Sequence, residues 1–233
     1  MTLAKILAPF SPADGLAVAA LLSGWLAIGW FIEHSSDARP SVGRIVARYR
    51  RDWMVQMVTR QPRIFDSAVL ATLREGTSFF ASAVMIAIGG GLALMGDPTR
   101  LSGLVRDLGQ EAAPDFVWEI KLTLSLLLLV NAFLAFVWSH RLFGYCAVVM
   151  ASVPNEVDDP TALPRAAKAA EINITAARSF NRGLRAVYFA MAALAWLAGP
   201  LALGGATLLT IYVLWRREFR STSRRVLLRP DLE

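Results

Sequence analysis

The chain has 233 residues, of which 55% are hydrophobic and 18% charged, with a mean hydropathy of +0.47 and a formal net charge of +6. The apolar residues gather in long blocks instead of recurring at amphipathic spacing, which excludes an ordinary soluble domain and indicates a membrane protein. Cys146 is the one cysteine, which excludes an intrachain disulfide and a structural zinc site built on cysteines. At this length we expect a single membrane domain, residues 1–233, without a separate soluble domain.

Long stretches without a charged residue recur along the chain: Leu16–Ile32, Gly76–Gly96, Leu122–His140 and Ala186–Trp215. An α-helix rises about 1.5 Å per residue, so roughly 20 apolar residues cross the hydrocarbon core of a bilayer. The sequence therefore predicts an all-α integral membrane helical bundle with four transmembrane segments and long helices extending into the cytoplasm. The expected spans are residues 15–33, 68–96, 117–140 and 186–215.

A basic segment, residues 38–62, joins the first two predicted spans. Its apolar residues recur at i, i+3, i+4 and i+7, with arginines on the opposite side. They are Val42, Ile45, Val46, Tyr49, Trp53 and Met57. This pattern is typical of an amphipathic helix that lies on the membrane surface with its arginines toward anionic headgroups. The alternative is a cytosolic extension of the second span. Gln61-Pro62 should break the helix before that span begins.

Residues 160–185 are alanine-rich, and we expect them to form a cytoplasmic helical segment. Sidedness follows from Lys and Arg, which favour the cytoplasmic side. With four single spans the two sides hold 14 and 10 basic residues, which favours an N-terminus outside. If residues 186–215 instead form a hairpin at Gly199-Pro200 and Gly204-Gly205, the count becomes 20 against 4. Each leg would then have only about 15 residues, so one long helix kinked at Pro200 is the favoured prediction.

Several short motifs stand in a distinctive order between residues 44 and 221. They are Phe79-Phe80-Ala81-Ser82 with Gly89-Gly90-Gly91; Ala132-Phe133, Phe136, Trp138 and Arg141; Tyr145-Cys146 with Pro154; Asn181, Gly183-Leu184-Arg185-Ala186, Tyr188-Phe189, Trp196 and Pro200; and Arg216-Arg217-Glu218-Phe219. In this order they resemble the domain of unknown function 599 family of bacterial membrane proteins. The resemblance implies an uncharacterised multi-pass protein of the bacterial cytoplasmic (inner) membrane, and it transfers no catalytic residue.

Arginines gather just before the last predicted span, where Arg182 and Arg185 are three residues apart and share a helix face. Beside a bilayer, such a cluster suits a lipid phosphate or an acidic protein face. The candidate lipid- or partner-binding residues are Arg178, Asn181, Arg182, Arg185 and Tyr188. The alternative is that these arginines only set the topology of the chain.

Three polar residues fall within predicted spans or at their edges. Arg74 and Glu75 lie at the edge of the second span, and Asn131 lies near the middle of the third. Polar groups at membrane depth are default pointers to function, so these residues are candidates for lining a substrate path. The alternatives are an interfacial pair that reaches the headgroups and, for Asn131, an interhelical hydrogen bond.

The sequence contains no recognisable nucleophile motif, metal-binding motif or phosphate-binding glycine loop. We therefore predict no catalytic residue, no metal site, no cofactor and no enzymatic activity. The first functional hypothesis is a scaffold or accessory protein that binds anionic lipid headgroups or a membrane protein partner, which includes a second copy of itself, and no nucleic acid. The alternative is a small oligomeric transporter or channel subunit, with Glu75 and Asn131 lining its path.

Overall fold

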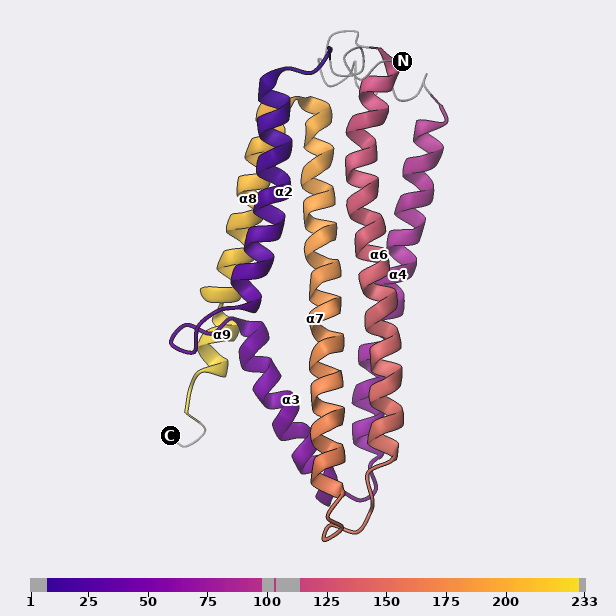
Figure 1. Ribbon diagram of the computed structural model, residues 1–233, viewed down its shortest axis with the longest axis vertical. Helices are drawn as coiled ribbons and strands as arrows, with labels where there is room; N and C mark the ends of the chain where they lie inside the picture. Colours follow the sequence, from indigo (N-terminus) through magenta and orange to yellow (C-terminus); the bar gives the residue numbers. More distant parts are fainter. Residues whose placement is uncertain (1–7, 98–102, 104–113, 231–233) are drawn as a thin grey trace. The chain divides into compact units, whose positions relative to one another are not determined.

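The computed structural model describes residues 8–97, 103 and 114–230. This part of the chain is helical and contains no β-strand, which confirms the predicted all-α class. The elements in chain order are α2 (Pro12–Glu33), α3 (Val42–Thr59), α4 (Ile64–Met95), α6 (Asp115–Ala151), α7 (Ala162–Leu194), the short 3-10 helix η1 (Ala195–Ala198), α8 (Pro200–Phe219) and α9 (Thr222–Leu227) (Figure 1).

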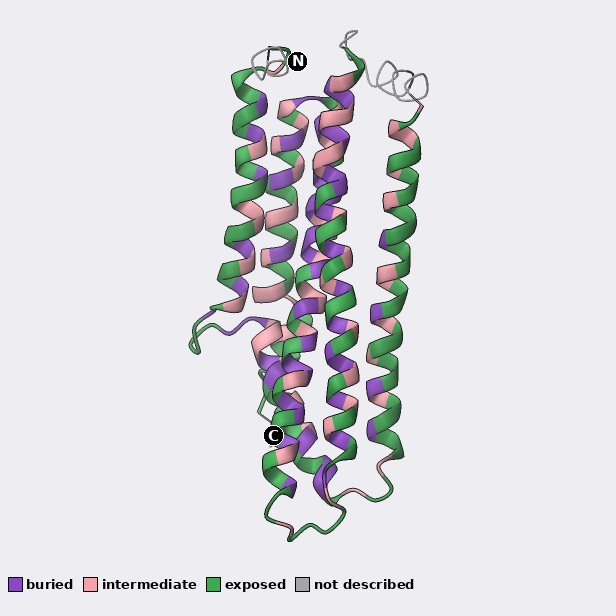
Figure 2. Cartoon of the chain, turned by 45° about the vertical axis from the view of Figure 1, so that its right-hand side comes forward, coloured by how far each residue is buried: buried purple, intermediate pink, exposed green. Residues whose placement is uncertain are grey.

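Three of these helices, α2, α4 and α6, are long and apolar enough to cross a bilayer. Their apolar side chains are largely uncovered by the protein itself. In α4 only 6% of the apolar stretch is buried, and exposed positions run along much of the chain (green in Figure 2). A soluble monomer rarely leaves so much contiguous apolar surface in water. The surface is therefore that of a membrane protein.

The favoured prediction of one kinked helix over residues 186–215 is wrong. Helix α7 ends at Leu194, η1 follows, and α8 begins at Pro200. Gly199 has φ +109° and ψ 171°, a backbone conformation that essentially only glycine adopts, and Pro200 suits the first position of a helix. Helix α8 then runs back along α7 (Figure 1), since Met191 of α7 and Leu209 of α8 line one shallow groove.

The objection to a hairpin came from the length of its legs. Helix α7 has 33 residues, because it starts at Ala162 and continues without interruption through the predicted cytoplasmic segment. Helix α8 has 20 residues, because it continues past Trp215 to Phe219. Both legs are therefore longer than the 15 residues assumed, although α7 and α8 are not among the three helices that are apolar enough to cross a bilayer by length and composition.

The chain divides into two compact units. Unit 1 comprises Met1–Phe31, Val84–Ala132 and Leu184–Arg216, and unit 2 comprises Ile32–Ala83, Phe133–Gly183 and Arg217–Glu233. Helices α4, α6 and α7 contribute to both units, because the division falls inside each of them.

Unit 1 packs its helices closely through small residues. A methyl group added at Gly91 of α4 would lie 2.5 Å from Leu126 Cδ2 of α6, and one at Gly24 of α2 would lie 2.7 Å from Ile211 Cδ1 of α8. The hydroxyl of Ser125 in α6 donates to the carbonyl oxygen of Ala190 in α7 at 2.8 Å. Such close contacts and interhelical hydrogen bonds hold helices together where no water is present to drive apolar association.

Unit 2 has an apolar core to which α3 contributes one face. Met54, Met57 and Val58 of α3 are buried in a cluster with Phe143 and Cys146 of α6 and with the alanines of α7. The predicted break between α3 and α4 at Gln61-Pro62 is present. Of the residues predicted to face the membrane surface, Ile45 and Met57 are covered by protein, so the prediction is wrong for them, whereas Tyr49 is exposed. An amphipathic pattern alone does not distinguish a lipid surface from a protein core.

Candidate functional site

Unit 2 contains a cavity of about 380 Å³ with walls from α3, α4, α6, α7 and the last turn of α8. Its apolar walls include Val46, Leu73, Phe143 and Phe180. Its polar side chains are Arg50, Thr72, Thr77, Asn181 and Glu218, and we call it the Arg50 pocket. This size and composition are those of sites that bind small molecules, where a few polar groups orient a mostly apolar ligand.

Arg50 is a half-buried cation of the pocket without an acidic partner. Its Nη1 donates to the side-chain oxygen of Asn173, and no ion pair joins it to a carboxylate among the described residues. Desolvation by burial lowers the pKa of its guanidinium, because the surroundings stabilise the charge less than water does. Arginine nevertheless stays charged in proteins. An anion beside Arg50 would therefore offset the cost of burying this charge.

Asn173 holds Arg50 from the interior of the unit. This asparagine is fully buried in α7, and its Nδ2 donates to Cys146 Sγ at 3.5 Å. The thiol in turn donates to the carbonyl oxygen of Ala169 at 3.4 Å. A buried asparagine must satisfy both its donor and its acceptor, and this one does so with Cys146 and Arg50. The network fixes where the guanidinium lies.

Glu218 also lines the pocket. Its Oε2 accepts a hydrogen bond from the backbone N–H of Gly43 at 3.2 Å, in the first turn of α3. A carboxylate is stabilised there because the first N–H groups of a helix lack internal partners and the helix dipole is positive at that end. Asn181 of α7 is half-buried and lines the same pocket, and its amide can donate as well as accept.

The side chains of the pocket can bind an anion that carries an apolar portion. The guanidinium of Arg50 presents five N–H donors, most of which Asn173 does not use, and they fit a phosphate or carboxylate. The aromatic and aliphatic walls fit an apolar portion of the same ligand. Within the described part of the chain, no group of three or more His, Cys, Asp and Glu side chains could hold a metal ion.

A family model described as "Protein of unknown function, DUF599" matches residues 16–223, which is most of the chain. The chain belongs to the DUF599 family. No curated protein and no solved structure matches it. In this DUF599 protein, two of the motif segments that carried the resemblance meet in unit 2, because Asn181 of one and Glu218 of the other line the same Arg50 pocket.

Of the five candidate lipid- or partner-binding residues of this DUF599 protein, only Asn181 lines the pocket. Arg182 is bound to Glu33, with Nε 3.0 Å from Oε1 and Nη2 2.5 Å from Oε2. Arg178 is exposed. The guanidinium charge of Arg182 is therefore already matched within unit 2.

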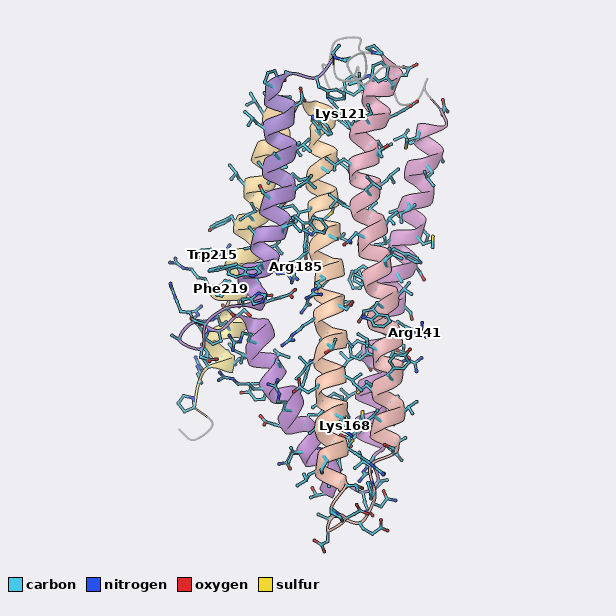
Figure 3. The ribbon with its side chains drawn as sticks, viewed as in Figure 1. Lys121, Arg141, Lys168, Arg185, Trp215 and Phe219 are labelled. Atoms are coloured by element: carbon cyan, nitrogen blue, oxygen red, sulfur yellow. The ribbon has the colours of Figure 1, made fainter. Side chains whose placement is uncertain are left out.

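The other two candidates belong to unit 1. Arg185 is only 7% exposed and lies against α2, where a methyl group added at Gly29 would be 3.6 Å from its Nε (Figure 3). Tyr188 lines the groove between α7 and α8. The five residues thus follow one another along α7 without forming one site, because successive turns of a long helix face different neighbours.

The intramembrane polar candidates belong to different units. Arg74 and Glu75 are exposed in unit 2, and Arg74 Nη2 lies 3.5 Å from His140 Nε2. Asn131 belongs to unit 1 and is exposed, so the interhelical hydrogen bond expected for it inside the bundle is not formed. Neither unit by itself holds a path lined by both Glu75 and Asn131.

Arg50 was not among the predicted site residues, although the sequence contains a signal for it. Arg50 is four residues after Val46, three before Trp53 and seven before Met57, so it interrupts the apolar stripe of α3. The other arginines of this helix lie on its polar side. An arginine on the buried stripe of an amphipathic helix therefore indicates either an internal partner or a ligand.

Proposed function

We propose that this DUF599 protein is a multi-pass protein of the bacterial inner membrane that binds an anionic lipid headgroup in the Arg50 pocket. In this proposal it acts without enzymatic activity, as an accessory protein that couples a lipid to a membrane assembly. The observation that carries the proposal is the half-buried guanidinium of Arg50, which lines a largely apolar cavity and forms no ion pair among the described residues, since Glu218 of the same cavity accepts from the Gly43 N–H instead. A concave site with apolar walls favours a lipid over the flat acidic face of a protein.

The distribution of charge supports the proposed membrane topology. The segments of unit 2 carry 18 of the 24 Lys and Arg residues of the chain. With α7 and α8 as antiparallel legs, the proposal has five crossings, by α2, α4, α6, α7 and α8. The basic count is then 20 against 4, with the N-terminus outside and the C-terminal tail in the cytoplasm. The polar parts of α4, α6 and α7 would extend from the bilayer on the cytoplasmic side.

The same distribution supports the choice of ligand. Basic side chains beside a membrane attract the anionic lipids of its cytoplasmic leaflet, roughly 1 kcal/mol for each Lys or Arg near the surface. Exposed arginines of unit 2, such as Arg48 and Arg178, would concentrate these lipids without selecting one. Selection would come from Arg50 and Asn181, which meet the headgroup inside a shaped cavity.

Arg50→Gln tests the proposal, because glutamine keeps a donor for Asn173 and removes the charge. The full-length protein is titrated with phosphatidylglycerol in detergent, and bound lipids are counted by native mass spectrometry. We expect a loss of affinity of roughly tenfold or more for Arg50→Gln, as for a charged hydrogen bond. Arg178→Gln removes the same charge from an exposed position, and in detergent, where no charged bilayer surface is present, it should change the affinity less than twofold.

Two further arms of the experiment distinguish the source of the anion. Phosphatidylcholine carries the phosphate without net charge, and inorganic phosphate carries it without acyl chains. Binding of phosphatidylglycerol alone supports the lipid proposal, whereas equal binding of inorganic phosphate would replace it with a soluble anion. An equal loss of phosphatidylglycerol affinity in the Arg50→Gln and Arg178→Gln variants would contradict binding in the Arg50 pocket. Asn181→Leu, which obstructs the pocket and leaves Asn173 in place, serves if Arg50→Gln fails to fold.

A further inference from the structure

Unit 2 contains a second cavity, of about 370 Å³, with walls from the end of α3, the start of α4 and the end of α6. Its lining is mostly apolar and includes Met57, Leu70 and Met150. Asp66 and Arg63 also line it, and we call it the Asp66 pocket. Neither of these two residues lines the Arg50 pocket.

Asp66 is fully buried and only half satisfied. Its Oδ1 accepts hydrogen bonds from the indole Nε1 of Trp53 at 2.7 Å and from Arg60 Nη1. Its Oδ2 is buried and has no hydrogen-bond partner among the described residues. A buried acceptor without a donor costs free energy, so a wall that contains one favours a ligand that donates to it.

Arg63, three residues before Asp66 in the chain, contains an unpaired donor. Its Nη1 donates to the carbonyl oxygen of Val153 at 2.6 Å, and its Nη2 donates to that of Pro154 at 2.7 Å. These carbonyls fix the guanidinium at the end of α6. Its Nε is buried and has no acceptor within the described part of the chain. Two residues that line the pocket therefore each contain one buried polar atom without a partner, an acceptor in Asp66 and a donor in Arg63.

The charges around this pair exclude a simple ion as the best ligand. Arg60 already compensates the carboxylate of Asp66, and Arg74 also lines the pocket, so an organic cation would be repelled. An anion would meet the unpaired Oδ2 of Asp66. A neutral group that both donates and accepts, such as a hydroxyl or a primary amide, satisfies both atoms.

We propose that the Asp66 pocket binds a neutral molecule with an apolar body and a hydroxyl head, which donates to Asp66 Oδ2 and accepts from Arg63 Nε. The apolar body lies against Met57, Leu70 and Met150. The ligand class is thus a neutral alcohol, in contrast to the anion of the Arg50 pocket, and neither assignment depends on the other.

Trp53 reports directly on this site, because its indole donates to the same carboxylate. The probes are bromo-octanol, which quenches nearby tryptophan, the acceptor-only bromo-octanone and the headless bromo-octane. They are titrated into the full-length protein in detergent, and a Trp53→Phe variant gives the contribution of the other tryptophans. We expect saturable quenching of Trp53 by the alcohol. The ketone should bind about tenfold more weakly, because it leaves Asp66 Oδ2 without a donor.

Asp66→Asn should change the preference of the pocket for the alcohol over the ketone. Its oxygen must still accept from Trp53 and Arg60, so its NH₂ takes the position of Oδ2 and becomes a donor. The ketone then satisfies two donors, and it should bind at least as well as the alcohol. An unchanged preference would overturn the assignment, and so would quenching by the alcohol that does not saturate or that bromo-octane reproduces.

Two cavity-filling variants test the location without touching the polar pair. Ala147→Leu narrows the Asp66 pocket and should abolish saturable quenching by bromo-octanol. Ala177→Leu narrows the Arg50 pocket and should leave this quenching unchanged while it weakens phosphatidylglycerol binding. Loss of alcohol binding in the second variant but not the first would refute the assignment of the alcohol to the Asp66 pocket.

Discussion

The carboxylate of Glu218 accepts a hydrogen bond from the backbone N–H of Gly43, with 3.2 Å between Oε2 and N, although 175 residues separate them. A second contact follows six residues later, in α9, where Arg224 Nε donates to the carbonyl oxygen of Pro40 at 3.0 Å. The end of α8 and the helix α9 after it are thereby attached to the start of α3. The C-terminal segment is part of the Arg50 pocket for this reason.

Removing this attachment should loosen the C-terminal segment. Glu218→Ala leaves the Gly43 N–H without its side-chain acceptor and removes a negative charge from the N-terminus of α3, at a cost of about 1 kcal/mol. We expect faster amide hydrogen exchange in the first turn of α3 and faster tryptic cleavage at Arg224 and Arg225. Glu156→Ala, at an exposed turn, is the control. Equal exchange in both variants would show that Glu218 does not hold the segment.

Asn173 should be among the most sensitive polar residues of unit 2. Asn173→Ala removes the acceptor of Arg50 and the donor to Cys146 from a fully buried position, so we expect a loss of about 2–4 kcal/mol in the free energy of unfolding. Unfolding of detergent-solubilised protein by SDS measures it. Thr175→Ala, exposed on the same helix, should cost less than about 1 kcal/mol. A similar cost for the two variants would contradict a buried network.

Two glycines in long helices should respond to alanine with opposite signs. A methyl group at Gly183 would lie 2.7 Å from Phe136 Cε1, and Phe136 is fully buried with the rings of Phe80 and Phe180 at 5.6 and 5.4 Å. The ring cannot move aside, so Gly183→Ala should lower the unfolding temperature, at a cost of about 1–3 kcal/mol.

Gly144 is the matched case in α6. Nothing lies within 4 Å of a methyl group added there, so Gly144→Ala should raise stability by about 0.5–1 kcal/mol through helix propensity. Thermal unfolding of the two variants under the same conditions compares the signs. Destabilisation by both would indicate that something outside the chain covers Gly144.

The fold of residues 186–215 predicts the side of the tail. In a Cys146→Ala background, cysteines introduced at Ser36 and at Ser223, both exposed, should be protected from an impermeant maleimide in intact cells and react in inverted vesicles. A cysteine at Gly103, also exposed, should react in intact cells. Labelling of both Ser223→Cys and Gly103→Cys in intact cells would instead support a single kinked span over residues 186–215.

The residues of the Arg50 pocket could be predicted from the sequence only in part. The clustering of arginines before residue 186 directed attention to α7, and Asn181 does line the pocket. Arg182 was chosen with it, but its guanidinium is already paired with Glu33, 149 residues away, which the sequence did not reveal. Arg50 and Asp66 were missed because each matters for hydrogen-bonding atoms of its charged side chain that the protein does not pair. That property depends on which helices pack together, and it cannot be read from local spacing.

The amino-acid sequence alone determined the class of this protein. Uncharged stretches of bilayer length leave a chain no other way to satisfy its backbone polar groups than helices, so the all-α membrane fold and the helix breaks near Gln61-Pro62 follow from local chemistry. Tertiary structure decided the rest. Whether Gly199-Pro200 kinks a helix or reverses it depends on the surface available to the second leg. Whether the apolar face of α3 meets lipid or protein depends on the alanines of α7, because both environments satisfy the same pattern.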